Sequence, residues 1–500
     1  MIGLNFGLSY RTARALMMFT VTSAGDTGAA NELRWAINKA NGSGGGIIKF
    51  NIGSGLQTIM PNSPLPDITQ QVTIDGMTQP GSPTCGPTFN LLIQITPSAT
   101  FGATGDGLVF SGPNTNGSKV SGLVINGFPF SGISLNNAQN VTVKCNFLGT
   151  DTNGTAPVAN GIDGVAILNG AHNNQIGGTT PAERNIISGN LSAGVNVIDG
   201  GADNNTIQGN YIGTDVTGTV ALPNQFGGID LFSTTPPNGP KGNTISGNVI
   251  SGNVNQGIAI RDPGTSLNIV TGNFIGTNAT GTAVIPNTGY GVGIFAKAHD
   301  NRIGGTTPAE RNIISGNANQ GVTVTEPGAD NNTIEGNYIG TDVTGNLALP
   351  NLYDGIALFS SNPISGPQYN TISGNLVSGN TNTGILLANF GTDYNTISGN
   401  YVGTNAAGTA ALGNGLDGIR LDTLGSPIGP RNNTISGNVS SANTWSGIAL
   451  SGIGTNKNTI SGNYAGTDAT GTVALGNKFH GIVLFSDPSA RLWPIWGQYA

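Results

Sequence analysis

The sequence predicts an all-β chain wound as a single-stranded parallel β-helix, a solenoid, behind an N-terminal cap that contains one helix. A glycine, an aliphatic residue, a free position and a second aliphatic residue recur at steps of 29 to 34 residues. Such a period is the signature of a repeat architecture. Apolar residues alternate with period two inside each motif, which is typical of a strand. The motif glycines are Gly132, Gly164, Gly194, Gly228, Gly257, Gly291, Gly321, Gly355, Gly384, Gly418, Gly447 and Gly481.

Residues 1–18 are predicted to be a leader or a poorly defined segment. Arg11 and Arg14 precede only a short apolar run, residues 15–21, with no clear small-residue cleavage site after it. A secretory signal peptide combines a longer apolar region with such a site. The sequence therefore has no clear signal peptide, and no stretch approaches the ~20 apolar residues of a membrane-spanning helix.

Residues 19–106 are predicted to form the cap and the first coils. A helical stripe with i, i+3, i+4, i+7 spacing lies between Asp26-Thr27, taken as the N-terminal cap, and Asn41-Gly42. Strand-like runs at 47–50 and 72–74 follow it. A cap of this kind would cover the open edge of the first coil. The stripe consists of Leu33, Ala36, Ile37 and Ala40.

Residues 107–485 are predicted to form the β-helix repeats, beginning with a looser copy of the motif at Gly107. Each motif is followed by a second short strand, such as 243–248, and often by a third, such as 249–253. Three strands and three turns per coil describe a parallel β-helix in which each strand pairs with its copy in the next coil. Thirteen coils at ~4.8 Å each give a length of about 60 Å.

Asparagine recurs at one corner of the predicted coil. The favoured interpretation is that the residues there only make turns, and the alternative is that they also hydrogen-bond to one another along the solenoid as a ladder. Both interpretations are structural. The residues are Asn210, Asn273, Asn337, Asn400 and Asn463.

Every second coil carries an insert that begins with Gly-Thr followed by aspartate or asparagine. A row of carboxylates could attract calcium, but calcium sites need more oxygen charge than a row diluted by asparagine supplies. Asx-type turns are the favoured interpretation, so no cofactor is expected, and calcium is the alternative. The residues are Asp151, Asp215, Asn278, Asp342, Asn405 and Asp468.

The outward positions of the first strand in each coil test for an enzyme, because polysaccharide lyases and hydrolases need clustered carboxylates. Asp230 stands alone there. Arg420 and Asp422 point the same way and are interpreted as an exposed ion pair rather than a base beside an acid. Outward Leu386→Ala is expected to cost much less stability than inward Ile356→Ala. The outward residues are Ser134, Ala166, Asn196, Asp230, Ala259, Gly293, Thr323, Ala357, Leu386, Arg420, Ala449 and Val483.

Four phenylalanines recur at the end of the first strand on coils that carry an insert. The favoured interpretation is that each packs beneath its own insert. The alternative is an aromatic row that stacks sugars of a polysaccharide or of cell-surface glycans. The four are Phe232, Phe295, Phe359 and Phe485.

His172 and His299 are equivalent copies 127 residues apart, followed by matched Glu183-Arg184 and Glu310-Arg311. Four coils separate the copies by roughly 19 Å, so the histidines cannot share a metal or a proton relay. Duplication of a four-coil block as a structural turn motif is favoured over a repeated binding site.

Two cysteines do not make a disulfide framework. Cys85 lies in an irregular region and Cys145 in an early coil, and the sequence leaves open whether they pair or stay as two thiols.

Residues 486–500 form an aromatic C-terminal tail that is too short for another coil. Trp493, Trp496 and Tyr499 could fold over the last strand as a lid or join two molecules end to end. End-to-end self-association is the hypothesis, because unpaired strand edges invite pairing.

Charge excludes two classes of partner. The net charge is −7 and charged residues make up only 9% of the chain. An acidic chain without a basic patch is not expected to bind nucleic acid or an anionic membrane. Aliphatic periodicity sufficient for a continuous core argues against disorder.

The segments 19–26, 32–41 and 204–215 resemble bacterial extracellular right-handed β-helix repeat proteins, within the pectate-lyase-like superfamily. The resemblance implies a right-handed solenoid with an extracellular or cell-surface location. It is specific for fold rather than for function, because the fold carries lyases, hydrolases, adhesins and fibres. The sequence favours a non-catalytic structural protein with an adhesive, matrix or fibre-forming role. The alternative is a polysaccharide-binding protein or a polysaccharide lyase or hydrolase.

Overall fold

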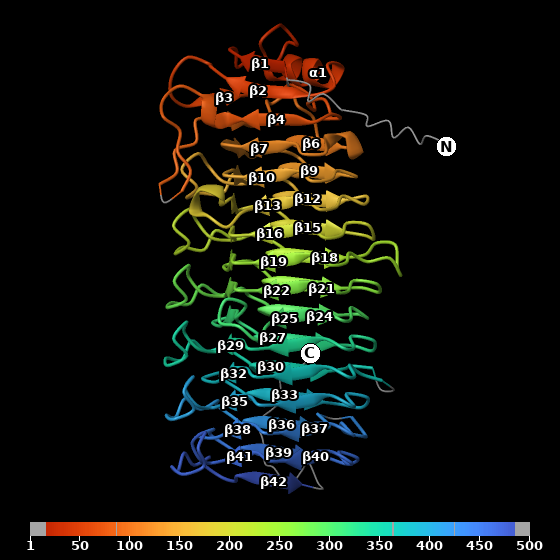
Figure 1. Ribbon diagram of the computed structural model, residues 1–500, viewed down its shortest axis with the longest axis vertical. Helices are drawn as coiled ribbons and strands as arrows, with labels where there is room; N and C mark the ends of the chain where they lie inside the picture. Colours follow the sequence, from red (N-terminus) through yellow and green to blue (C-terminus); the bar gives the residue numbers. More distant parts are fainter. Residues whose placement is uncertain (1–16, 87, 363–364, 425, 486–500) are drawn as a thin grey trace, which may run out of the picture.

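A computed structural model describes residues 17–86, 88–362, 365–424 and 426–485. Within them the chain winds as an elongated column of stacked coils, with the cap at one end (Figure 1). Three sheets, all parallel, run the length of the column. The predicted parallel β-helix is therefore confirmed.

The strands of the three sheets are short. Sheet A has fifteen: β1 (Met17–Val21), β2 (Gly46–Phe50), β4 (Val72–Asp75), β7 (Lys119–Ser121), β10 (Thr142–Lys144), β13 (Gln175–Gly177), β16 (Thr206–Gln208), β19 (Thr244–Ser246), β22 (Ile269–Thr271), β25 (Arg302–Gly304), β28 (Thr333–Glu335), β31 (Thr371–Ser373), β34 (Thr396–Ser398), β37 (Thr434–Ser436) and β40 (Thr459–Ser461). Sheet B has fourteen: β3 (Gln57–Ile59), β5 (Ile93–Ile95), β8 (Leu123–Ile125), β11 (Phe147–Leu148), β14 (Ile186–Ile187), β17 (Tyr211–Ile212), β20 (Val249–Ile250), β23 (Phe274–Ile275), β26 (Ile313–Ile314), β29 (Tyr338–Ile339), β32 (Leu376–Val377), β35 (Tyr401–Val402), β38 (Val439–Ser440) and β41 (Tyr464–Ala465). Sheet C has thirteen: β6 (Leu108–Ser111), β9 (Ile133–Asn136), β12 (Val165–Leu168), β15 (Val195–Ile198), β18 (Ile229–Phe232), β21 (Ile258–Arg261), β24 (Val292–Phe295), β27 (Val322–Thr325), β30 (Ile356–Phe359), β33 (Ile385–Ala388), β36 (Ile419–Asp422), β39 (Ile448–Ser451) and β42 (Ile482–Phe485).

The cap contains α1 (Leu33–Gly42), which packs on β1 and β2 with its predicted stripe buried. The helix is capped differently from the prediction. Its N-cap is Glu32, and the Glu32 carboxylate accepts bonds from the backbone N–H groups of Thr27, Gly28 and Ala29 at 2.7 to 3.0 Å. Asp26 instead pairs with Arg34, because the chain turns between residue 26 and the start of the helix. Short 3-10 turns follow at η1 (Gly76–Thr78), η2 (Pro113–Thr115) and η3 (Pro181–Glu183).

The core is one continuous column of inward aliphatic side chains that extends from Val21 in the cap to Leu450. Each residue stacks on its copies in the adjacent coils, as Ile356 does between Val322 and Ile385. Burial of this apolar surface is the main stabilising term, and every coil depends on its two neighbours for it.

The asparagines form ladders, so the ladder interpretation is confirmed, and there are three ladders rather than one. In each, a side-chain N–H donates to the Oδ1 atom of the next coil, as Asn337 does to Asn375 at 3.0 Å. The same Oδ1 atom also accepts a backbone N–H, so these buried amides are satisfied. The ladders run through Asn174, Asn205, Asn243, Asn268, Asn301, Asn332, Asn370, Asn395, Asn433 and Asn458; through Asn146, Asn185, Asn210, Asn248, Asn273, Asn312, Asn337, Asn375, Asn400, Asn438 and Asn463; and through Asn160, Asn190, Asn224, Asn253, Asn287, Asn317, Asn351, Asn380, Asn414, Asn443 and Asn477.

The inserts are Asx-type turns, as predicted. The Asp215 carboxylate accepts bonds from the N–H groups of Thr219 and Val220, both at 3.1 Å, and from the Thr217 hydroxyl. The equivalent bonds hold the pKa of the Asp342 carboxyl below its usual value, although partial burial opposes them. Consecutive inserts also touch, because the Ala279 N–H donates to the Gly218 carbonyl at 3.0 Å.

The aromatic residues beneath the inserts belong to sheet B. A Cβ added at Gly218 would lie 2.7 Å from the Tyr211 ring, so glycine lets the insert settle on this ring. Packing of Phe232 and its copies beneath the inserts stays a prediction, whereas six side-chain rings of sheet B contact the inserts. The rings that do so are Phe147, Tyr211, Phe274, Tyr338, Tyr401 and Tyr464.

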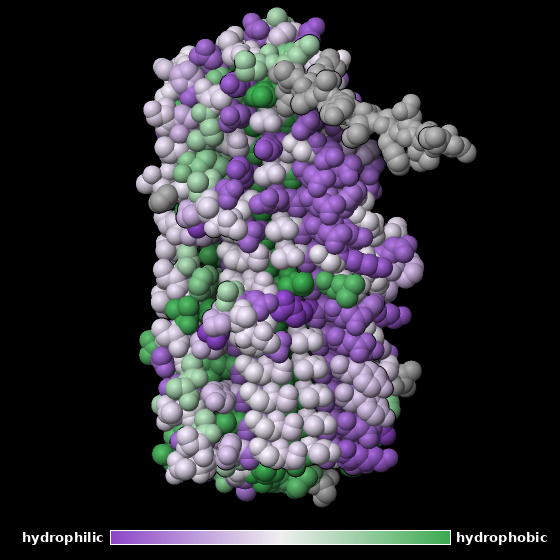
Figure 2. Space-filling model, in the orientation of Figure 1, coloured by the Kyte–Doolittle hydropathy of each residue, from purple (hydrophilic) through white to green (hydrophobic). Residues whose placement is uncertain are grey.

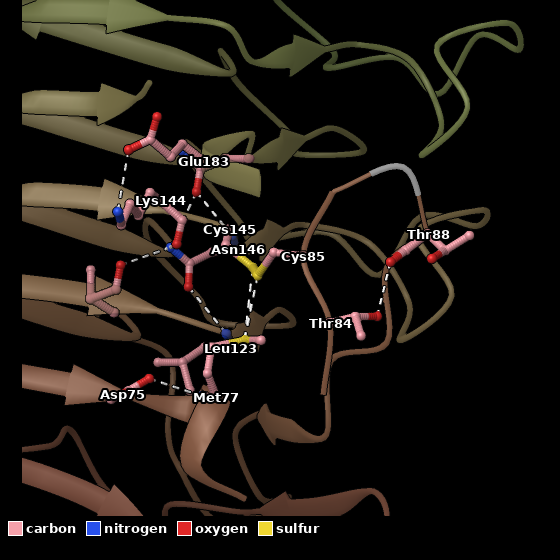
Figure 3. Close-up of a disulfide and its surroundings, with 12 residues drawn as sticks. Asp75, Met77, Thr84, Cys85, Thr88, Leu123, Lys144, Cys145, Asn146 and Glu183 are labelled. Carbon is pink, nitrogen blue, oxygen red and sulfur yellow. Dashed lines mark hydrogen bonds and ion pairs between the residues drawn. A yellow bond between two sulfur atoms is a disulfide. The ribbon is translucent and has the colours of Figure 1, made fainter. Parts of the chain in front are cut away.

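Cys85 and Cys145 form a disulfide, which resolves the pairing that the sequence left open (Figure 3). The bridge fastens the irregular loop around residues 80–90 of the cap to the turn after β10. The Met77 sulfur lies beside both cysteine sulfurs.

Hydrophilic side chains gather along one vertical edge of the column (Figure 2). In the lower half of the visible face, side chains of intermediate hydropathy form regular rows. No helix in the described part of the chain is long and apolar enough to cross a membrane.

Candidate functional site

The outward face of sheet C is covered, contrary to the expectation of an exposed row. Leu386, Asp230 and Arg420 expose only 3%, 2% and 5% of their surface. Leu386 packs with Ala357 and Ala388 in a small apolar cluster, against which Phe359 and Leu424 also pack. Neighbouring side chains from adjacent coils bury this row, which single-strand alternation cannot reveal.

Asp230 has a partner that the sequence analysis did not identify. Arg261, one coil further on, donates from Nη2 to Asp230 Oδ2 at 2.7 Å and from Nε to Oδ1 at 3.1 Å. The guanidinium also lies over the Phe232 ring, 4.4 Å from its centroid. This two-point pairing and stacking suit arginine rather than lysine. The Arg261 side chain keeps 33% exposure, whereas Asp230 is buried.

Asp163 and Asn196 extend this arrangement toward the N-terminus. Asn196 Nδ2 donates to Asp163 Oδ1 at 2.9 Å, and the Ala193 N–H donates to the same oxygen at 3.1 Å. Burial raises the pKa of Asp163 to about 6 against the effect of these bonds. Asn196 Oδ1 is buried without a hydrogen-bond partner. We call Asp163, Asn196, Asp230, Arg261 and Phe232 the N-terminal polar group.

A second cluster, the C-terminal polar group, consists of Asp354, Asp417, Arg420 and Asp422. Arg420 Nε donates to Asp422 Oδ2 at 2.6 Å, and the two side chains expose only 7% and 4% of their surface. The pair is thus buried, not exposed as predicted, because the flanking turns enclose it. Burial also raises the pKa of Asp354 to about 6, with Oδ1 accepting from the Thr383 N–H at 3.1 Å.

Asp163, Asp354 and Asp417 were missed as site residues. A signal was present, because in each case the aspartate directly precedes the glycine that opens a strand of sheet C. A pattern read only between the two aliphatic residues of the strand passes over this position.

The four phenylalanines lie half-buried at one edge of the same outward face. The Arg261 guanidinium lies over the Phe232 ring. The ring centroids of Phe295 and Tyr290 are 5.8 Å apart, and those of Phe485 and His480 are 6.3 Å apart. The first three are two coils apart, about 9.6 Å. Such a spacing suits a polymer that repeats along its length.

Trp493, Trp496 and Tyr499, the candidates for self-association, lie outside the described residues. His172 contacts the Gly170 carbonyl through Nδ1 at 2.8 Å, and His299 contacts Asp300 at 2.6 Å, so the two copies have separate partners. Across the residues that the structure describes, no three histidine, cysteine or acidic side chains form a group that could hold a metal ion.

Residues 310–484 match the family model described as "Right handed beta helix region". No curated protein matches the chain in sequence. Among solved structures, the chain is similar to the A-module of mannuronan C-5 epimerase AlgE4 from Azotobacter vinelandii, with 15% identity over 91% of this chain and 93% of that chain and a TM-score of 0.40. The Dettilon tailspike protein is 14% identical over 77% of this chain and 66% of that chain, with a TM-score of 0.44. The periplasmic alginate epimerase AlgG is 12% identical over 88% of this chain and 77% of that chain, with a TM-score of 0.35.

These distant likenesses transfer no activity to the chain. The family match and the three parallel sheets identify the chain as a right-handed parallel β-helix protein.

Proposed function

We propose that this chain is a rigid, non-catalytic solenoid that binds polysaccharide along the edge of the outward face of sheet C, where Phe232 and its copies lie. One observation carries the proposal: Arg261 is stacked on Phe232, anchored by Asp230 and one-third exposed. An aromatic ring beside a fixed guanidinium offers both an apolar surface and hydrogen-bond donors for a sugar. The phenylalanines on further coils extend this surface.

Binding is favoured over cleavage because three carboxylates of the two polar groups are already engaged with other side chains. Asp230 and Asp422 pair with arginine, and Asp163 bonds to Asn196. A hydrolase needs one free acid and one free base or nucleophile beside the glycosidic bond. Acids also outnumber arginines in both polar groups, so an uncharged polymer is favoured over a polyanion.

The decisive experiment is affinity electrophoresis of the purified chain through gels that contain neutral or acidic polysaccharides. Phe232→Ala should weaken retardation by a neutral polymer several-fold, because it removes the aromatic ring against which a sugar would pack. Tyr369→Ala is the matched control, because Tyr369 is 54% exposed on a different corner of the column. Equal retardation of the two variants contradicts the proposed surface.

Cleavage is tested on the same polymers through the release of unsaturated or reducing ends, with varied calcium and pH. No turnover is expected. Turnover that Asp230→Asn or Arg420→Ala abolishes would replace the binding proposal with an enzyme.

We also propose an extracellular or cell-surface location. The Cys85–Cys145 disulfide supports it, because disulfides persist in oxidising compartments. Alkylation of cell fractions under denaturing, non-reducing conditions should leave both cysteines unmodified, because sulfur atoms joined in a disulfide do not react. Two free thiols in the native host would contradict this location.

End-to-end self-association through Trp493, Trp496 and Tyr499 stays a prediction. Light scattering of the whole chain and of a variant ending at Asp487 tests it, since association should depend on the tail. A strictly monomeric whole chain would reject it.

A further inference from the structure

The duplicated four-coil block contains two copies of one surface pocket. The pocket in the second copy lies between β23, the turn after β25 and the insert that contains Val343. Each lining residue has a counterpart 127 residues earlier, and seven of the eight pairs are identical. The pairs are Cys145 and Gly272, Asn146 and Asn273, Phe147 and Phe274, Pro181 and Pro308, Ala182 and Ala309, Arg184 and Arg311, Ile186 and Ile313, and Val216 and Val343.

The first pocket is filled by the chain itself. The loop around residues 80–90 crosses it, held by the disulfide from Cys85 to Cys145 (Figure 3). Phe89 packs on Phe147 with 5.2 Å between ring centroids, and Phe147 is 1% exposed as a result. A Cβ at Gly86 would lie 3.9 Å from Ala182, so the loop also passes over the turn.

The second pocket is open, with a volume of about 190 Å³. Phe274 is only partly buried where Phe147 is fully buried, and Val343 is 37% exposed. Gly272 replaces Cys145 with nearly the same backbone, at φ +67° against +56°. No loop of the described chain is joined to this position.

The walls of both pockets have the same conformation. The Arg184 guanidinium lies 3.9 Å from the centroid of the Tyr211 ring, and the Arg311 guanidinium lies 4.0 Å from that of Tyr338. The backbone bond from residue 145 to Glu183 recurs from Gly272 to Glu310. The second pocket is therefore preformed, which lowers the ordering cost of binding.

We propose that the second pocket binds an irregular peptide loop of another protein through a phenylalanine seated as Phe89 is in the first pocket. The occupied copy identifies the chemistry of the partner: an uncharged loop with one aromatic side chain against Phe274, Ile313 and Val343. The glycine leaves this contact reversible, whereas the cysteine makes the first one permanent. This interaction is separate from the outward face of sheet C.

Disulfide tethering tests the proposal with the chain's own loop as probe. The probe is a synthetic peptide of residues 79–91 whose Cys85 carries 2-mercaptoethanol as a mixed disulfide. The thiolate introduced by Gly272→Cys attacks the Cys85 sulfur, forms the protein–peptide disulfide and releases 2-mercaptoethanol, so no external oxidant is needed. Intact-mass spectrometry follows the rate.

Gly399→Cys is the matched control, because Gly399 has a similar φ of +64° and open space around it. Tethering should be at least tenfold faster at position 272 than at 399. A Phe89→Ala peptide should lose this advantage. Equal rates at the two positions, or equal rates for the two peptides, overturn the proposal.

A second variant guards against misfolding at position 272. In the wild-type background, a fluorescent peptide of residues 79–91 with Cys85→Ser should bind, and Val343→Asp should weaken it at least tenfold. If the wild-type chain does not bind the peptide, the proposal is overturned. It is also overturned if neutral oligosaccharides abolish the faster tethering at position 272, because the pocket would then be a sugar subsite.

Discussion

The inward and outward faces of sheet C share their strands but differ in how their side chains are chosen. Inward positions mostly hold valine, isoleucine or leucine, so that one coil resembles the next in its inward residues. Outward positions hold aspartate, alanine, leucine or arginine, yet they are buried almost as completely. Burial alone therefore does not distinguish the inward face of sheet C from its outward face.

The outward face itself divides in two. In the N-terminal polar group Arg261 is one-third exposed and rests on Phe232. In the C-terminal polar group Arg420 is enclosed with Asp422. A partly exposed arginine can contact a ligand without unfolding its surroundings, whereas an enclosed pair serves mainly the structure. Four predictions test this contrast, from the largest expected effect to the smallest.

Arg420→Ala should lower the free energy of unfolding by about 3–5 kcal/mol, because it leaves the Asp422 carboxylate buried without its partner. Urea denaturation followed by circular dichroism measures the loss. The double variant Arg420→Ala/Asp422→Ala should recover part of it. A loss below about 1 kcal/mol would mean that the pair is solvated like a surface ion pair.

Leu386→Ala should cost about as much as Ile356→Ala, each about 2–5 kcal/mol, since both remove a buried aliphatic side chain. This revises the expectation that an outward leucine costs much less. Thermal unfolding of the two variants compares them directly. If Leu386→Ala hardly changes the stability, the side chains that cover the outward face rearrange easily to fill the space.

Asp354→Asn should stabilise the protein above pH 6 and have little effect near pH 4. Burial raises the folded-state pKa of Asp354 from 3.8 to about 6, so the folded state binds the proton more tightly and loses stability as pH rises through this window. The pKa difference corresponds to about 3 kcal/mol at most. Unfolding midpoints from pH 4 to pH 8 measure it.

Two controls fix the sign of that pH effect. Asp163→Asn should behave like Asp354→Asn, because burial also raises the Asp163 pKa to about 6. Asp342→Asn should show the opposite trend, because the folded-state pKa of Asp342 is lowered and its contribution is lost as pH falls. Parallel pH profiles for all three variants would contradict the assignment.

Arg261→Lys should cost only about 1 kcal/mol in stability, since the charge beside Asp230 is kept and only the two-point geometry is lost. Retardation by neutral polysaccharide should nevertheless fall several-fold. Unchanged binding would assign Arg261 to the fold alone. Arg431→Lys is a control, because Arg431 pairs with Asp393 outside the N-terminal polar group.

The sequence predicted the parts of this protein that repeat. The period of the glycine motif, the inward aliphatic residues and the stripe Leu33, Ala36, Ile37 and Ala40 all matched the structure. These features depend on backbone geometry within one coil, where alternation and turn chemistry are local. The sequence also showed some of the ladder asparagines. Only alternate members of one ladder were recognised, because they were searched for with the two-coil period of the inserts.

The tertiary structure alone decided which side chains meet across coils. Asp230 and Arg261 are 31 residues apart, and whether they touch depends on the register of β18 on β21 and on the reach of the arginine. The Cys85–Cys145 bridge likewise required the path of an irregular loop. Local periodicity determines the direction in which a residue points, whereas contacts between coils determine whether it is exposed, paired or enclosed.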